Sequence, residues 1–203
     1  QKQELRNAML FLQQYGITNN LAVKIYQKYG EQMYQVMKEN PYRLAEDISG
    51  VGFKIADEIA MKTGIGAESD YRIHAAILYA LTQAAGNGHI YLPESELLYQ
   101  TTQILGMPLE DIKRHITVLS VEKKVVLKKE QEECCIYLAI YYYLELNTAK
   151  MLLDLSVVYP ISGEAILARL TQIEKKLSLA LDEMQRQAVI EAVRNGLFIL
   201  TGG

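Results

Sequence analysis

Apolar residues near the start of the chain recur three or four positions apart, which is the spacing of one face of an α-helix. The apolar blocks are Leu5, Ala8, Met9 and Leu12; Ala22, Ile25, Tyr26 and Tyr29; and Gly52, Ile55, Ala56 and Ile59. Asn40 and Pro41 suit the cap and first position of another short helix, which runs to Ile48. Residues 1–70 are therefore predicted to form two helical hairpins.

The turns of these hairpins have related sequences, Gly16-Ile17-Thr18 and Gly50-Val51-Gly52. Glycines at 50 and 52 predict a backbone path closed to residues with a Cβ, and they let main-chain N–H groups approach an anion. The helix that follows adds unpaired N–H donors and a partial positive charge. Such a turn is typical of helix-hairpin-helix modules, which hold nucleic-acid phosphates without reading bases. The candidate DNA-binding residues are Gly16, Ile17, Thr18, Gly50, Val51, Gly52, Phe53 and Lys54.

An alternative for both turns stays open, because glycine, a hydrophobe and glycine also join ordinary packed helices. In the first turn a threonine replaces the second glycine, so its phosphate contact is the less certain of the two. Gly64-Ile65-Gly66 has a sequence similar to these turns, but it precedes a polar, acidic segment. Gly64 is therefore predicted to be a helix C-cap.

Residues 71–155 have a different order of elements. The predicted elements are a helix over 73–84, a short strand at 90–92, helices over 93–105 and 108–120, and strands at 124–128 and 134–140. A polar segment separates the last two strands and indicates a hairpin. Helix, strand, helix, helix and a two-stranded wing is the order of a winged-helix domain.

The helix over 108–120 carries Lys113, Arg114 and His115 and is a candidate to contact duplex DNA. A packing role between domains is the alternative, because a few polar residues on a helix usually form a solvated face. His115 is predicted to be a surface residue, since the sequence places no nucleophile or carboxylate cluster beside it.

Composition narrows the kind of DNA contact. The 203 residues are 50% hydrophobic, with a formal charge of −3 and a pI near 5.7, so a generally basic nucleic-acid coat is excluded. Adjacent Cys134 and Cys135 are predicted to be reduced packing residues, and the three histidines lack metal-ligand spacing, so no metal is expected. No signal peptide or membrane span is predicted. The missing initiator methionine indicates that the chain begins inside a longer protein.

The C-terminal segment begins with a predicted joint at 156–163 and helices over 164–176 and 181–193. An apolar strand over 197–200 then runs into Thr201-Gly202-Gly203. A P-loop ATPase motif begins in this way, although its second glycine, lysine and Ser/Thr are not in the chain.

Leu181, Gln185 and Ala188, upstream of that strand, resemble the Q-motif of superfamily 1 helicases. Other parts of the resemblance are Asn40-Pro41-Tyr42, the turn from Gly50 to Phe53, Ala56-Asp57 and the segment 88–93. With these motifs in this order, the chain resembles the RecD-like DNA helicases, which are related to the alpha subunit of exodeoxyribonuclease V.

This resemblance implies a bacterial, cytoplasmic, ATP-dependent helicase that moves 5′ to 3′ on DNA in repair and recombination. The expected partners are single-stranded or forked DNA, without sequence specificity, and other repair proteins. It implies that Gln185 contacts adenine and that Gly202 and Gly203 begin the P-loop, with ATP and Mg²⁺ as cofactors of the parent protein. The chain itself would hold no catalytic residue, would bind neither cofactor well, and would be inactive.

The predicted fold is mainly α. Residues 1–70 form a tandem helix-hairpin-helix, 71–155 a winged-helix-like module with a small β-hairpin, and 156–203 a linker and the truncated start of a RecA-like motor domain. Two other functions remain open: a non-enzymatic scaffold that binds DNA junctions, and a protein-interaction module in which both hairpins only pack helices.

Overall fold

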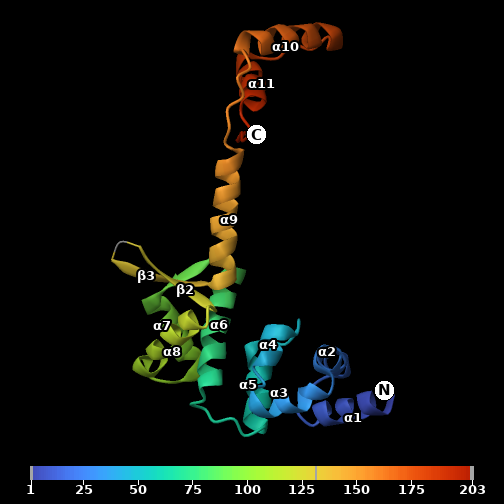
Figure 1. Ribbon diagram of the computed structural model, residues 1–203, viewed down its shortest axis with the longest axis vertical. Coiled ribbons are helices and arrows are strands. Elements are labelled where there is room, and N and C mark those ends of the chain that lie inside the picture. Colours follow the sequence, from blue (N-terminus) through green and yellow to red (C-terminus); the bar gives the residue numbers. More distant parts are fainter. Residues whose placement is uncertain (1, 131, 202–203) are drawn as a thin grey trace. The chain divides into compact units, whose positions relative to one another are not determined.

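The computed structural model describes residues 2–130 and 132–201 (Figure 1). Contacts divide the chain into two compact units, Gln1–Tyr142 and Tyr143–Gly203. Helix α9 (Ala139–Leu155) begins in the first unit and supplies the first residues of the second. The domain boundaries proposed from the sequence at residues 70 and 155 stay predictions.

The N-terminal part of the first unit is entirely helical. Its elements are α1 (Lys2–Gln13), α2 (Asn19–Tyr29), the short 3₁₀ helix η1 (Gly30–Gln32), α3 (Met33–Glu39), α4 (Arg43–Asp47) and α5 (Phe53–Lys62). Most of the predicted stripes are the buried faces of these helices, since Leu12, Ile25 and Ile59 are at most 1% exposed. Ile55 was predicted to face the core but is 38% exposed, because the buried face of α5 runs through Phe53, Ala56 and Ile59 instead. The turn from α1 to α2 and the turn from α4 to α5 are the two predicted hairpins.

The end of α5 agrees with the sequence prediction for Gly64. This glycine has a positive φ of 83°, its N–H donates to the Met61 carbonyl at 3.2 Å, and the Ile65 N–H donates to the Ala60 carbonyl at 2.9 Å. This pair of bonds is the usual glycine-dependent end of a helix. Gly64 therefore closes α5 and does not open a third helical hairpin.

The rest of the first unit has the predicted order of helices and strands. Its elements are α6 (Asp70–Gly86), β1 (Tyr91–Pro93), α7 (Glu94–Leu105), α8 (Leu109–Val121), β2 (Val125–Glu130) and β3 (Glu133–Leu138). The three strands form an antiparallel sheet in the order β1-β3-β2, with Tyr137 of β3 opposite Tyr91 on one side and Val126 on the other. Cys135 of β3 is buried and both cysteines are free thiols.

One hydrophobic core runs through the first unit, from Ala8 of α1 to Ile136 of β3. Within it, the rings of Tyr42, Phe53 and Tyr79 are stacked in series, with centroid separations of 5.9 and 5.5 Å. Because these residues come from the residue before α4, the start of α5 and the middle of α6, they hold the second hairpin against α6.

A polar contact reinforces the same junction. The Asp57 carboxylate accepts hydrogen bonds from the Tyr42 hydroxyl at 2.6 Å and from Arg72 Nε at 2.8 Å, and the Asp57 and Arg72 side chains are 16% and 13% exposed. The hydrogen bond to Asp57 raises the pKa of Arg72, while burial and then the hydrogen bond raise the pKa of Tyr42. The start of α5 is thus fixed on two sides.

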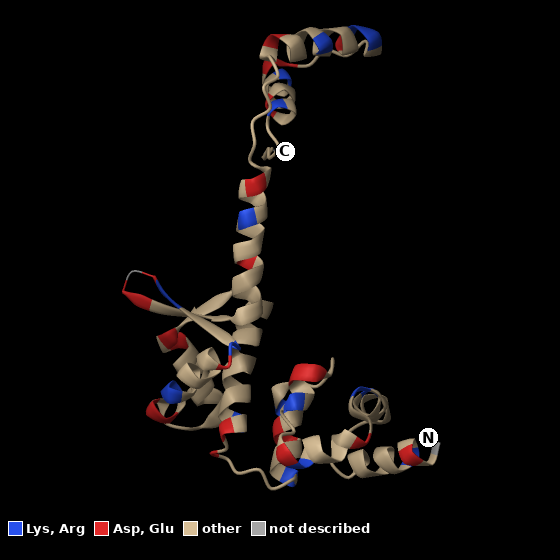
Figure 2. Cartoon of the chain, viewed as in Figure 1, with Lys and Arg blue, Asp and Glu red and all other residues tan. Residues whose placement is uncertain are grey.

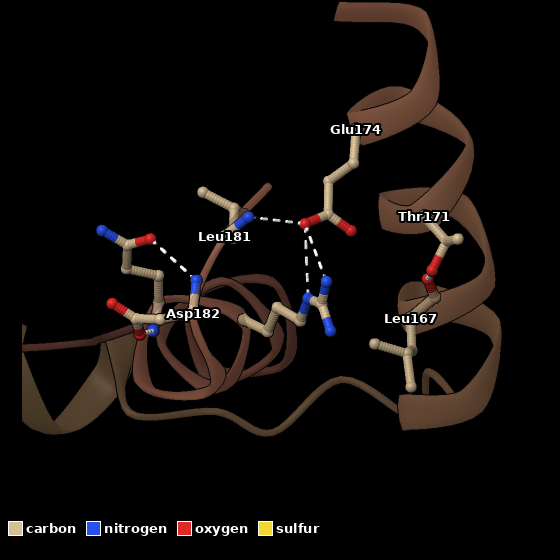
Figure 3. Close-up of polar contacts among 7 residues, drawn as sticks. Leu167, Thr171, Glu174, Leu181 and Asp182 are labelled. Atoms are coloured by element: carbon tan, nitrogen blue, oxygen red, sulfur yellow. Dashed lines mark hydrogen bonds and ion pairs between the residues drawn. The ribbon is translucent and has the colours of Figure 1, made fainter. Parts of the chain in front are cut away.

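The second unit contains the continuation of α9 and the helices α10 (Gly163–Leu177) and α11 (Glu183–Arg194). Figure 3 shows Glu174 of α10 reaching the start of α11, where its carboxylate accepts from the Leu181 N–H at 2.7 Å and from Arg186 Nη2 at 3.1 Å. The Leu181 N–H, followed by Arg186, lowers the pKa of Glu174. These bonds connect two helices whose shared apolar core is small.

The predicted strand over 197–200 is not formed, and Leu197–Thr201 lie outside any helix or strand. A strand is stable only when a neighbour satisfies its backbone N–H and C=O groups. Among the described residues of this unit, the single bridge between Val158 and Asn195 is the only sheet-like pairing, and it does not extend to Leu197. Gly202 and Gly203 lie outside the described residues.

Within the part of the chain that the structure describes, no helix has both the length and the apolar character needed to cross a membrane.

Candidate nucleic-acid interface

The two hairpin turns begin and end in matching backbone conformations. Gly16 and Gly50 open the turns with φ values of 81° and 101°, which favour glycine over residues with a side chain. Thr18 and Gly52 close them in extended conformations, as the N-caps of α2 and α5. The threonine of the first turn therefore takes the same place and role as the second glycine of the other.

The prediction that Gly52 needs a backbone conformation closed to residues with a Cβ was wrong. Its φ of −96° is open to residues with a side chain, and a Cβ built on it would meet no atom within 4 Å. Glycine is required by conformation at position 50 and not at position 52. The space in front of Gly52 is free, as it also is at Gly64 and Gly66.

The hydrophobic residues of both turns face inward. Ile17, Val51 and Phe53 are at most 5% exposed, so their side chains belong to the core and do not project from the helix ends toward a phosphate. The Ile17 and Val51 N–H groups are also engaged, by the carbonyls of Leu12 and Ile48. The side chains of these three residues can therefore only hold the turns in place. Of their main-chain N–H groups, that of Phe53 is the one left for a ligand.

The first turns of α2 and α5 remain available to a ligand. No side chain caps either helix at Thr18 or Gly52, and the first N–H groups with helical partners are those of Ala22 and Ala56. The N–H groups that precede them point out of the helix ends and carry the positive end of the helix dipole. One folded unit thus presents two uncapped helix N-termini, those of the 11-residue α2 and the 10-residue α5.

Each turn also receives a lysine from the other hairpin. Lys24 of α2 donates from Nζ to the Ser49 carbonyl at 3.1 Å, and Lys62 of α5 donates from Nζ to the Tyr15 carbonyl at 3.1 Å. Both contacts are exposed, and an ammonium group has three donors, so each retains donors for an anion. Sequence reasoning missed both lysines, because they occupy different positions relative to their turns and show no repeat.

The remaining charge around the turns is mixed. Figure 2 shows Asp and Glu interspersed with Lys and Arg in this part of the chain. Lys54 is exposed in the first turn of α5, whereas exposed Asp47 precedes the second turn and accepts a hydrogen bond from the Tyr29 hydroxyl. The turns are therefore not surrounded by a generally basic surface.

The structure differs from the prediction for the second contact surface, on α8. His115 is not a surface residue as predicted, because it is only 4% exposed and its Nδ1 lies 3.2 Å from Nε2 of His74 on α6. Arg114 Nε donates to His115 Nε2, so in this arrangement the ring is neutral and its Nδ1–H donates to His74. Burial lowers the pKa of both histidines. Of the predicted trio only Arg114 and Lys113 stay exposed, and Lys113 is paired with Glu94.

Gln185 of the predicted nucleotide site has a local structural role. Its N–H donates to Asp182 Oδ1 at 2.8 Å, and its Oε1 accepts from the Asp182 N–H at 3.0 Å, which is a reciprocal cap at the start of α11 (Figure 3). An adenine contact of Gln185 stays a prediction, as do the roles of Gly202 and Gly203. In the ranges 2–130 and 132–201, no group of three or more His, Cys, Asp or Glu side chains is arranged to hold a metal ion.

Two hairpins that present helix N-termini through glycine turns define a helix-hairpin-helix type of DNA-binding module. Residues 1–91 match the family model described as the ATP-dependent RecD2 DNA helicase HHH domain, where HHH denotes helix-hairpin-helix. The match spans both hairpins and α6 and ends at Tyr91, the first residue of β1. It supports an N-terminal, DNA-binding region of a RecD2-type helicase, which is the broader part of the predicted resemblance.

Proposed function

We propose that the two hairpins bind the phosphate backbone of DNA at two places, without reading its sequence, as the accessory region of an ATP-dependent helicase. The observation that carries this proposal is that both turns open with a glycine of positive φ and close with an extended N-cap that leaves the next helix without a side-chain cap, each beside a lysine from the other hairpin. The turn before α8, Gly106–Pro108, also has a glycine with a positive φ and an uncapped helix start. The feature that distinguishes the two hairpin turns is therefore the lysine that each receives from the other hairpin.

The physical basis is electrostatic and local. Each helix end supplies N–H donors and roughly half a positive charge, which stabilises a nearby anion by about 0.3–1 kcal/mol. Lys62 at the first turn and Lys24 at the second add a full charge each. A few such contacts give modest, salt-dependent affinity, with a slope of roughly 0.7 per phosphate on single-stranded DNA. This fits a chain with a net charge of −3 better than a broad basic surface does.

The role of the parent protein is part of the same proposal. The RecD2 match of residues 1–91 and the RecD-like resemblance support a parent helicase that uses ATP and Mg²⁺. By the resemblance, it moves 5′ to 3′ on single-stranded or forked DNA in repair and recombination, in the bacterial cytoplasm. We expect the 203-residue chain alone not to hydrolyse ATP, because the P-loop lysine is not among its residues.

The test uses N-cap substitutions that separate binding from folding. Asp is a strong N-cap whose carboxylate accepts the first N–H groups of a helix, so Thr18→Asp and Gly52→Asp fill the proposed phosphate sites with a negative charge. We expect the double variant to bind a fluorescent forked DNA at least about tenfold more weakly, by anisotropy at low salt. Its thermal unfolding midpoint should be unchanged or higher.

The matched control is Ser162→Asp, which makes the same change at the uncapped N-terminus of α10. This variant should bind the fork like the unaltered chain. If Thr18→Asp with Gly52→Asp leaves affinity unchanged while the fold is intact, the hairpins do not bind phosphate and the proposal is wrong.

A further inference from the structure

A cleft of about 610 Å³ lies directly beside the second hairpin. Gly52 and Phe53 form one wall, Tyr79 and Thr82 of α6 form another, and Lys123, which follows α8, lies on a third. All of these residues belong to the first compact unit. The volume is in the range of sites that enclose small organic molecules, roughly 300–1,000 Å³.

The cleft is lined by the stacked rings of Tyr42, Phe53 and Tyr79. Tyr42 and Phe53 are 1% and 5% exposed, whereas Tyr79 is half-buried and is the member of the series that a ligand can reach. Planar rings attract further planar rings in offset stacks. The cleft therefore suits a flat aromatic group that continues the series.

The charge at the cleft favours an anionic ligand. Lys124 is paired with Glu46 at 3.1 Å, which neutralises the carboxylate on the cleft wall. The exposed ammonium of Lys123 has no partner among the described residues, and the residue has a positive φ of 60°. The Lys123 and Lys124 N–H groups donate to Ser120 and Leu119, so Lys123 stands where helix ends normally use glycine. A lysine here accepts backbone strain and places a cation beside the cleft.

We propose that this cleft receives an unstacked nucleobase of the DNA strand whose phosphate lies at the N-terminus of α5. Gly52 and Phe53 belong both to that helix end and to the cleft wall, so one nucleotide can reach both places. The base stacks on Tyr79 while Lys123 meets the adjoining backbone. Stacking does not distinguish strongly among bases, so recognition stays independent of sequence. This inference rests on the proposed phosphate binding, and it adds a preference for single-stranded over base-paired DNA.

The experiment compares two strands that have the same phosphates and differ in bases. The full 203-residue chain is titrated against a labelled twelve-residue oligothymidylate and against an abasic strand of the same length. Because one stacked base is worth roughly a five- to hundredfold change in affinity, we expect the oligothymidylate to bind at least about fivefold more tightly.

Two pairs of variants assign this preference to the cleft. Tyr79→Leu removes the stacking ring but keeps an apolar side chain, and its control is Tyr71→Leu, an exposed tyrosine on the same helix outside the cleft. Thr82→Met fills the cleft from an exposed position, and its control is Thr171→Met, which has the same hydroxyl bond to the carbonyl four residues earlier. Thr82→Met leaves the core intact if Tyr79→Leu fails to fold.

We expect Thr82→Met, and Tyr79→Leu where it folds, to reduce the preference for the oligothymidylate to less than twofold, with unchanged binding of the abasic strand. Both control variants should keep the full preference. Equal binding of the two strands by the unaltered chain overturns the base site while phosphate binding stands. A preference that survives Thr82→Met in the folded chain overturns it as well. The proposed phosphate binding has its own test: it is wrong if the abasic strand does not bind at low salt.

Discussion

The first and second hairpins reach the same turn geometry with different sequences and different support. The first turn uses one glycine and Thr18, and the second uses Gly50 and Gly52, yet both end in an uncapped helix. The second hairpin is fixed to α6 by Asp57 and by the stacked rings, and it borders a cleft. The comparison teaches that the turn needs one glycine with a positive φ, and that the second hairpin is the more firmly held.

The largest expected effect concerns that support. Asp57→Ala leaves the guanidinium of Arg72 and the hydroxyl of Tyr42 without their acceptor, and we expect it to lower the free energy of unfolding by about 3 kcal/mol. Urea unfolding followed by circular dichroism measures this loss. The comparison variant is Asp47→Ala, which removes the exposed partner of Tyr29 and should cost less than about 1 kcal/mol. Equal losses would show that the second hairpin is not specially anchored.

The two glycines of the second turn should differ in how much an alanine substitution lowers the free energy of unfolding. Gly50→Ala forces a side chain into φ near 101°, which costs about 1–2 kcal/mol, and Gly16→Ala should cost about the same. Gly52→Ala enters open space at an ordinary φ, which favours alanine, but alanine is a poorer N-cap than glycine, so the two effects offset and the change should cost less than about 1 kcal/mol. Urea unfolding of the three variants checks the order, and a loss at Gly52 as large as at Gly50 would contradict the shared geometry.

An acid-sensitive contact lies in neither hairpin. Burial lowers the folded-state pKa of His74 and His115, so below about pH 6.5 the unfolded chain binds more protons than the folded one. The free energy of unfolding keeps its full value above that pH. It falls as the pH drops toward the folded-state pKa values, by at most about 1.4 kcal/mol per pH unit for each histidine. Urea unfolding between pH 7.5 and 5 measures this slope. The double variant His74→Gln, His115→Gln should give a flatter profile.

The smallest expected effects come from the crossed lysines. Lys24→Ala and Lys62→Ala should each weaken binding by about threefold, equally for all DNA sequences, and each should reduce the salt slope by roughly one. Anisotropy titrations at several salt concentrations measure both quantities. Lys38→Ala, on the exposed face of α3, is the control and should change neither. An effect of only one lysine would show that one hairpin carries the binding.

Much of the fold was predictable because its signal is local. The stripes through Leu12, Ile25 and Ile59 are helical in sequence and buried in the structure, and the wing follows from β-branched runs on either side of a polar turn. The positive φ of Gly50 was likewise predictable, because few other residues adopt it.

The parts that were missed depend on contacts between distant residues. His115 is buried by His74, a residue on another helix, and no pattern around His115 records that neighbour. Lys24 and Lys62 cross to turns that lie far from them in sequence. The strand expected at 197–200 has the right composition, but the described residues give it no strand to pair with. Local sequence patterns predict helices and strands, whereas the packing of distant segments decides which residues contact one another.

The most direct test of phosphate binding by the hairpins is an amide ¹H–¹⁵N NMR titration of the chain with a short single strand at low salt. The account predicts that the largest shifts fall on the first-turn N–H groups of α2 and α5, residues 19–21 and 53–55, while those around Lys113 of α8 stay in place. Shifts concentrated on α8, with both hairpin turns unmoved, would contradict it.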